Sequence, residues 1–155
     1  MPAIVEDTVR EVLEEVIAGL GLDGTVVVER DQEVVTGTVN GEDLGLFIGR
    51  HGQTIDAVQH LIFRIALTRG AGDEGDLRVV IDAEGYRARR AEALQRVADQ
   101  AAEDARRSGR PVALDAMTAS ERKLVHEYLR DRGGVETYSE GEEPDRHLVV
   151  APLVV

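Results

Sequence analysis

The sequence predicts an α+β fold made of two small α/β modules. Segments with helical periodicity and segments rich in β-branched residues alternate along all 155 residues. A chain of this length can hold one medium domain or two small ones. The most favourable boundary lies near Asp82–Gly85, where a predicted strand ends and a long predicted helix begins. We therefore predict modules over residues 1–83 and 84–155.

The first module is predicted to have the order α-β-β-α-α-β. Apolar residues at three- and four-residue spacing indicate its helices, and β-branched runs around a polar turn indicate a hairpin. In chain order, the elements are a helix at 4–18, strands at 25–29 and 34–39, a short helix at 43–48, a longer helix with Ile55, Val58, Leu61, Ile62 and Ile65 on one face, and a strand at 77–81.

The second module is predicted to begin with a long helix and to end with a strand pair. Thr118 and Glu121 have the spacing of a capping box, which indicates the start of a helix. The elements are a helix at 85–108, a brief strand at 112–114, a helix from the capping box to about 132, and strands at 135–138 and 147–150 around an acidic loop at 139–145.

Composition excludes several classes of protein. The absence of cysteine rules out disulfides, thiolate zinc sites and cysteine nucleophiles. No apolar run approaches the roughly 20 residues that span a bilayer, and the first residues lack the basic segment of a signal peptide. We therefore expect a cytoplasmic protein without membrane insertion.

The net charge of −12 weakens a nucleic-acid interpretation, because basic surfaces usually supply that affinity. The excess acid is unevenly distributed, however. Residues 1–45 contain two arginines, Arg10 and Arg30, against eleven carboxylates, whereas the remaining residues are closer to balance. An anion-binding site in the later part of the chain is therefore still compatible with the sequence.

The segment Gly49-Arg50-His51-Gly52 between two predicted helices is a candidate phosphate site. Glycines without side chains would let a sugar–phosphate backbone approach the main chain closely. The amides at the start of the following helix favour an anion, and Arg50 and His51 can donate to phosphate oxygens. The alternative is that the two glycines only turn the chain between packed helices.

This loop, within the order α-β-β-α-α-β, resembles a type II KH domain. In that family a Gly-x-x-Gly loop contacts the backbone of about four nucleotides. The resemblance implies RNA contact by Gly49, Arg50, His51 and Gly52. The two phenylalanines and three tyrosines are too few for folds that bind RNA on aromatic platforms, whereas a KH groove uses backbone and aliphatic contacts.

A second candidate site is the sequence Arg122-Lys123-Leu-Val-His126 on the capped helix. Arg122 and His126 are four residues apart, so both are expected on one exposed face, flanked by Lys123 and continued by Arg130. The alternative is an ordinary solvated helix face. With the following segment Val-Glu-Thr-Tyr-Ser-Glu-Gly-Glu-Glu-Pro-Asp, the pattern resembles the R-three-H domain, which binds single-stranded nucleic acid.

A KH domain followed by an R-three-H domain resembles the bacterial Jag family, also called KhpB. The resemblance implies single-stranded RNA as partner, post-transcriptional regulation linked to cell envelope growth, and pairing with a small single-KH protein. Many family members carry an additional N-terminal domain. The printed sequence begins at the first predicted KH helix, so we do not expect functions of that domain here.

Two other classes of function compete with this interpretation. An enzyme is not expected, because no P-loop, Gly-x-Ser-x-Gly or His-Glu-x-x-His motif is present and no two histidines are close in sequence. For the same reason we predict no cofactor and no metal. A protein-interaction scaffold, including a homodimer formed through sheet edges, is favoured by the negative charge and is left open.

Overall fold

The computed structural model describes residues 3–73 and 75–154, and its elements confirm the mixed α+β class. The chain divides into two compact units, Met1–Arg87 and Ala88–Val155. Each unit has its own sheet and its own hydrophobic core. The division falls a few residues beyond the boundary expected at 82–85, just inside helix α4 (Tyr86–Ser108).

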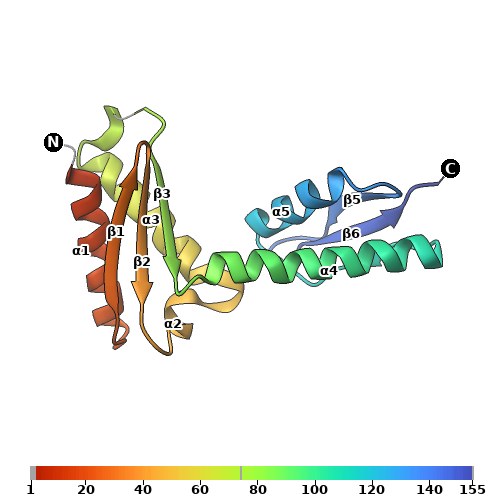
Figure 1. Cartoon of the computed structure of the whole chain (residues 1–155), viewed down its shortest axis with the longest axis horizontal. Coiled ribbons are helices and arrows are strands. Elements are labelled where there is room, and N and C mark those ends of the chain that lie inside the picture. The colour runs from red at the N-terminus through yellow and green to blue at the C-terminus, as the bar shows by residue number, and fades with distance from the viewer. Residues whose placement is uncertain (1–2, 74, 155) are drawn as a thin grey trace. The chain divides into compact units, whose positions relative to one another are not determined.

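The first unit has the predicted order α-β-β-α-α-β (Figure 1). Its three-stranded sheet has the order β1-β2-β3, with β1 antiparallel and β3 parallel to the central strand β2. The elements are α1 (Ala3–Gly19), β1 (Thr25–Asp31), β2 (Val34–Asn40), α2 (Gly45–Ile48), α3 (Gln53–Thr68) and β3 (Arg78–Ala83), with 3-10 turns at Arg50–Gly52 and Ala71–Asp73.

Helices α1 and α3 cover one face of this sheet, and the buried apolar positions of each helix recur at three- and four-residue spacing. From α1 these are Val5, Val9, Leu13 and Ile17, and from α3 they are Ile55, Val58, Ile62 and Ala66. Gly37 of β2 lies directly beneath α1. A β-carbon at Gly37 would stand 2.5 Å from Cγ1 of Val9 and 2.8 Å from Cδ1 of Leu13. The absence of a side chain therefore allows α1 to pack closely against the strand.

The second unit contains a three-stranded antiparallel sheet in the order β4-β6-β5. Its elements are most of α4, then β4 (Val112–Ala113), α5 (Ala119–Arg130), β5 (Val135–Glu140) and β6 (His147–Pro152). The contribution of α4 to the core is mostly alanine, and α5 adds Val125 and Leu129. Leu148 and Val150 of β6 complete this core.

Helix α5 begins with half of the predicted capping box. The Thr118 hydroxyl accepts a hydrogen bond from the Glu121 amide at 3.3 Å, as expected for an N-cap. The Glu121 carboxylate, however, accepts from Nε of Arg90 at 2.5 Å and so fastens α5 to α4. No helix within residues 3–73 and 75–154 combines the length and apolar character needed to cross a bilayer.

We predict that Gly37→Ala lowers the free energy of unfolding by about 1–3 kcal/mol, because the added methyl group overpacks the contact with Val9 and Leu13. Urea denaturation followed by circular dichroism would measure the change. Gly19→Ala is the matched control, since no atom lies within 4 Å of its added β-carbon. Equal stability of the two variants would contradict close packing of α1 at Gly37.

Candidate nucleic-acid interface

The loop between α2 and α3 has a backbone that depends on glycine. Gly49 has φ 75° and ψ 176°, a region that is essentially open to glycine only. His51 (φ 56°) and Gly52 (φ 79°) are both left-handed. Histidine tolerates this conformation better than most residues do. The four residues therefore form a sharp reversal that directs the chain into α3.

The space beside both glycines is occupied by the protein itself. A β-carbon at Gly49 would stand 2.2 Å from Oγ1 of Thr54, and one at Gly52 would stand 3.0 Å from Cε1 of Tyr86. The expectation that the missing side chains leave room for a sugar–phosphate backbone is therefore wrong on that side of the loop. The glycines permit the turn and the close packing of Thr54 and Tyr86.

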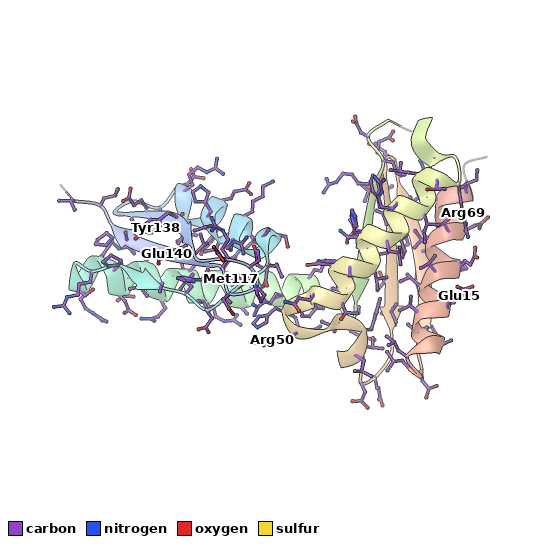
Figure 2. The ribbon with its side chains drawn as sticks, turned by 180° about the vertical axis from the view of Figure 1, so that it is seen from behind. Glu15, Arg50, Arg69, Met117, Tyr138 and Glu140 are labelled. Atoms are coloured by element: carbon purple, nitrogen blue, oxygen red, sulfur yellow. The ribbon has the colours of Figure 1, made fainter. Side chains whose placement is uncertain are left out.

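The cationic side of the loop is exposed. Arg50, labelled in Figure 2, is exposed, and within the described residues it has no ion pair. His51 is half-buried. Gly52 is the N-cap of α3 and provides no side-chain cap, and the Gln53 amide donates to the Arg50 carbonyl. An anion beside Arg50 would meet both the guanidinium and the positive end of the helix dipole.

Residues around the loop divide clearly between core and surface. Phe47 and Ile55 are fully buried, as predicted, and Ile48 packs at the margin of the same core. Leu46 of α2 and Leu61 of α3 are 65% and 51% exposed. The prediction that Leu61 shares one face of this helix with Ile55 and Ile62 is wrong, because Leu61 is exposed while those two residues are fully buried.

A polar network that the sequence did not predict joins α3 to the edge of β3. The Gln59 side-chain oxygen accepts from the Ile81 amide at 2.9 Å, and Nε of Arg87 donates to the Ile81 carbonyl at 2.6 Å. Arg87 also donates to Asp56 at 2.9 Å and to Gln59 at 3.0 Å. The backbone of β3 at Ile81 and the guanidinium of Arg87 are thus already bonded within the unit.

In the second unit, the four predicted residues of α5 do not form one exposed face. Lys123, His126 and Arg130 are exposed, but Arg122 is buried. Nη1 of Arg122 donates to the Met117 carbonyl at 2.6 Å, and Nη2 donates to Glu143 at 2.6 Å. The expected exposure of Arg122 is wrong, because this side chain lies under the acidic loop between β5 and β6.

An open pocket of about 360 Å³ lies between α5 and the β5–β6 hairpin. Three of the predicted residues line it, namely Arg122, Lys123 and His126. The opposite wall comes from Thr137, Tyr138, Ser139 and Leu148. Arg130 does not line the pocket and lies 3.9 Å from the Glu127 carboxylate.

The His126 ring is held by a short hydrogen bond between its Nδ1 and the Thr137 hydroxyl. If the hydroxyl donates, the neutral ring carries its proton on Nε2, which can then donate to a ligand. The neighbouring Tyr128 is engaged elsewhere. Its hydroxyl donates to the Asp99 carboxylate, and this bond raises the pKa of Tyr128. His126 is therefore oriented, whereas Tyr128 belongs to the contact between α4 and α5.

Within the described residues, no cluster of three or more histidine or carboxylate side chains could hold a metal ion. The two candidate surfaces consist of cations, hydroxyls, amides and exposed leucines. Such groups bind anions and bases by direct contact.

Comparison with known proteins gives a match for each unit. The KH domain of KhpA/KhpB matches residues 6–81, and the R-three-H domain matches residues 92–152. The protein is 34% identical over 148 residues to the "RNA-binding protein KhpB" of Clostridium symbiosum, covering 94% of this chain and 65% of that relative. Its identity to the protein of the same name from Bacillus subtilis is 34% over 143 residues, covering 91% and 66%.

The chain belongs to the KhpB family. A further KhpB, from Lactiplantibacillus plantarum, is 38% identical over 136 residues, which are 88% of this chain and 41% of that relative. The chain thus spans about two thirds of the length of two of these relatives and less than half of the third.

Both candidate surfaces lie inside the segments that match the KhpB domains. The loop at 49–52 falls in the KH match, and the residues of α5 and β5 that line the pocket fall in the R-three-H match. The contribution of β5 to this site was not identified from the sequence. The signal was the spacing of Thr137 and Ser139, since residues two apart on a strand point to the same face.

We predict that Arg122→Ala lowers the free energy of unfolding by about 1–3 kcal/mol, because the Met117 carbonyl and the Glu143 carboxylate lose the hydrogen bonds that the buried guanidinium donates to them. His126→Ala, at an exposed position one turn away, should cost less than about 1 kcal/mol. Urea denaturation of both variants measures this difference. A larger loss for His126→Ala would mean that Arg122 is not the structural residue of the pair.

Proposed function

We propose that this member of the KhpB family is a non-catalytic, cytoplasmic protein that binds single-stranded RNA and acts as a post-transcriptional regulator. The relatives named RNA-binding protein KhpB support the choice of RNA. The observation that carries the proposal is the exposed Arg50 beside the uncapped start of α3. That arrangement offers an anion a guanidinium beside the positive end of the helix dipole.

In the first unit, Arg50 and His51 contact consecutive phosphates while Gly49 and Gly52 hold the loop in the required turn. Leu46 and Leu61 offer apolar surface to the unstacked bases. The Gln59–Ile81–Arg87 network occupies the amide and the carbonyl of Ile81, so these two groups of β3 do not read base edges. Backbone contact therefore dominates in this unit, and sequence preference is weak.

In the second unit, Lys123 and His126 supply the phosphate contacts at the pocket. Arg122, which also lines the pocket, contributes a positive electrostatic potential there. Arg130 lies outside the pocket beside Glu127. Once one unit has bound an RNA, the second unit of the same chain binds that RNA intramolecularly, at a high effective concentration. The affinity of the whole chain therefore exceeds the modest affinity of each unit. Such a protein binds firmly only to RNA that is long enough to reach both units.

A second candidate function is protein pairing through the edge strand β1, either in a homodimer or with a small single-KH protein. Val27 of this strand is 42% exposed, and β1 is one of the two edges of its sheet. A salt titration separates the two functions. RNA binding through phosphates weakens steeply as salt rises, whereas strand pairing through apolar and backbone contacts changes little.

Replacing Arg50 and His51 together by aspartate should weaken RNA binding about tenfold or more, since repulsive charge then stands at the phosphate site. The slope of log affinity against log salt should fall by about 1.4, that is about 0.7 for each of the two lost phosphate contacts. Fluorescence anisotropy with a labelled single-stranded RNA of random sequence measures both. Aspartate tolerates the left-handed backbone at position 51, so the thermal unfolding midpoint should stay nearly constant.

The matched control is Arg10→Asp, which also reverses one exposed positive charge of the first unit, but on α1. It should change RNA affinity by less than about twofold. Equal losses in the control and the loop variant would show that only total charge matters. Unchanged affinity in the loop variant would remove the loop from the interface.

A further inference from the structure

The β5 wall of the pocket carries the hydroxyls of Thr137 and Ser139, and of these two only that of Thr137 has a hydrogen bond within the described residues. Thr137 is bonded to His126 of α5, and Ser139, two residues along β5, stands on the same face of the strand. Ser139 is half-buried and pairs in register with Leu148, which is 2% exposed. Within the described parts of the chain, the Ser139 hydroxyl forms no hydrogen bond.

The groups on the two walls of the pocket are complementary to one kind of ligand. On α5, the Lys123 ammonium is exposed and lies 4.0 Å from the Glu127 carboxylate, and Nε2 of His126 can donate to a ligand. On β5 the Ser139 hydroxyl can donate as well. Leu148 provides an apolar floor. Donors that converge from two walls suit a group with several acceptor oxygens, and a phosphate has such oxygens.

We propose that Ser139 contacts a phosphate of the bound nucleic acid directly and that Thr137 is a positioning residue, which orients His126 toward the same phosphate. This inference rests on the proposed RNA-binding function and names its contacts in the second unit. Ser139 adds a donor from the sheet to the donors of α5. A phosphate in the pocket is then held from both sides.

The contact by Ser139 is tested by Ser139→Ala in the full chain, with anisotropy of a labelled single-stranded RNA of random sequence. Affinity should fall about three- to tenfold, the usual effect of losing one hydrogen bond to a charged group. Ser120→Ala is the control, because Ser120 is exposed on α5 and does not line the pocket. It should leave affinity unchanged, and both variants should keep the thermal unfolding midpoint.

The positioning role of Thr137 requires a readout that a purely structural role would not move. Thr137→Val should weaken RNA binding about as much as His126→Ala does, and the double variant should bind no worse than either single one. Thr137→Ser keeps the hydroxyl and should restore binding. Additive losses, or no rescue by serine, would overturn this role.

The failure of this inference differs from the failure of the proposed function. If the wild-type protein binds the RNA and Ser139→Ala binds equally well, the contact is overturned while the function stands. If the wild-type protein does not bind the RNA at all, both are overturned.

The Arg122 guanidinium is already paired with a carboxylate of the β5–β6 loop. Arg122 is 8% exposed, and its Nη2 is 2.6 Å from Oε1 of Glu143, whose side chain is 60% exposed. Nη1 is taken by the Met117 carbonyl, so Nη2 is the nitrogen that faces an exchangeable partner. The geometry points to Glu143 as an internal competitor, whose carboxylate occupies the place of an RNA phosphate and leaves when RNA binds.

Glu143→Gln should therefore strengthen RNA binding about three- to tenfold and steepen the salt dependence by about 0.7, the contribution of one further phosphate contact. Glu142→Gln is the control. It removes the same charge from the same loop, and within the described residues its carboxylate has no ion pair. It should raise affinity by less than about twofold. A Glu143→Gln variant that binds no better than Glu142→Gln would overturn the competition.

Discussion

The position of α3 on its sheet depends on a turn that requires glycine at its first residue. Gly49 adopts φ 75° and ψ 176°, and the turn closes so tightly that a β-carbon there would collide with Thr54. Because the reversal is this sharp, Phe47 before it and Ile55 after it both reach the same core. The exposed Arg50 is thereby fixed on the outer side of a rigid turn. The turn that positions α3 on its sheet therefore also keeps the Arg50 guanidinium exposed.

The secondary structure could be predicted from the sequence because it follows from local patterns. The spacing of Val5, Val9 and Leu13 predicted α1, and the same three side chains are buried in the structure. The β-branched runs predicted the hairpin of β1 and β2, since such residues favour strands. The strands β5 and β6 were predicted shorter than they are. β5 is longer by the polar residues Ser139 and Glu140, which pair with Leu148 and His147 beside the loop. β6 is longer by Ala151 and Pro152, which pair with Glu136 and Val135 at the other end of the hairpin.

The environment of individual site residues could not be predicted, because it depends on contacts between distant segments. Arg122 reads as an exposed helix residue, and only the loop after β5 shows that it is buried under Glu143. Similarly, the sequence suggests open space beside Gly52, but in the structure Tyr86, more than thirty residues later in the chain, fills that space. The Gln59–Ile81 bond has no local signature either, since one partner is a backbone amide.

The network around Ile81 has a consequence for the behaviour of the protein in a crowded solution. β3 is an edge strand, and an edge with unsatisfied amides and carbonyls can recruit strands from other chains and so begin aggregation. Gln59 and Arg87 occupy the amide and the carbonyl of Ile81, and they place a charged group along the strand. β3 is thus blocked at Ile81 against the addition of a strand from another chain.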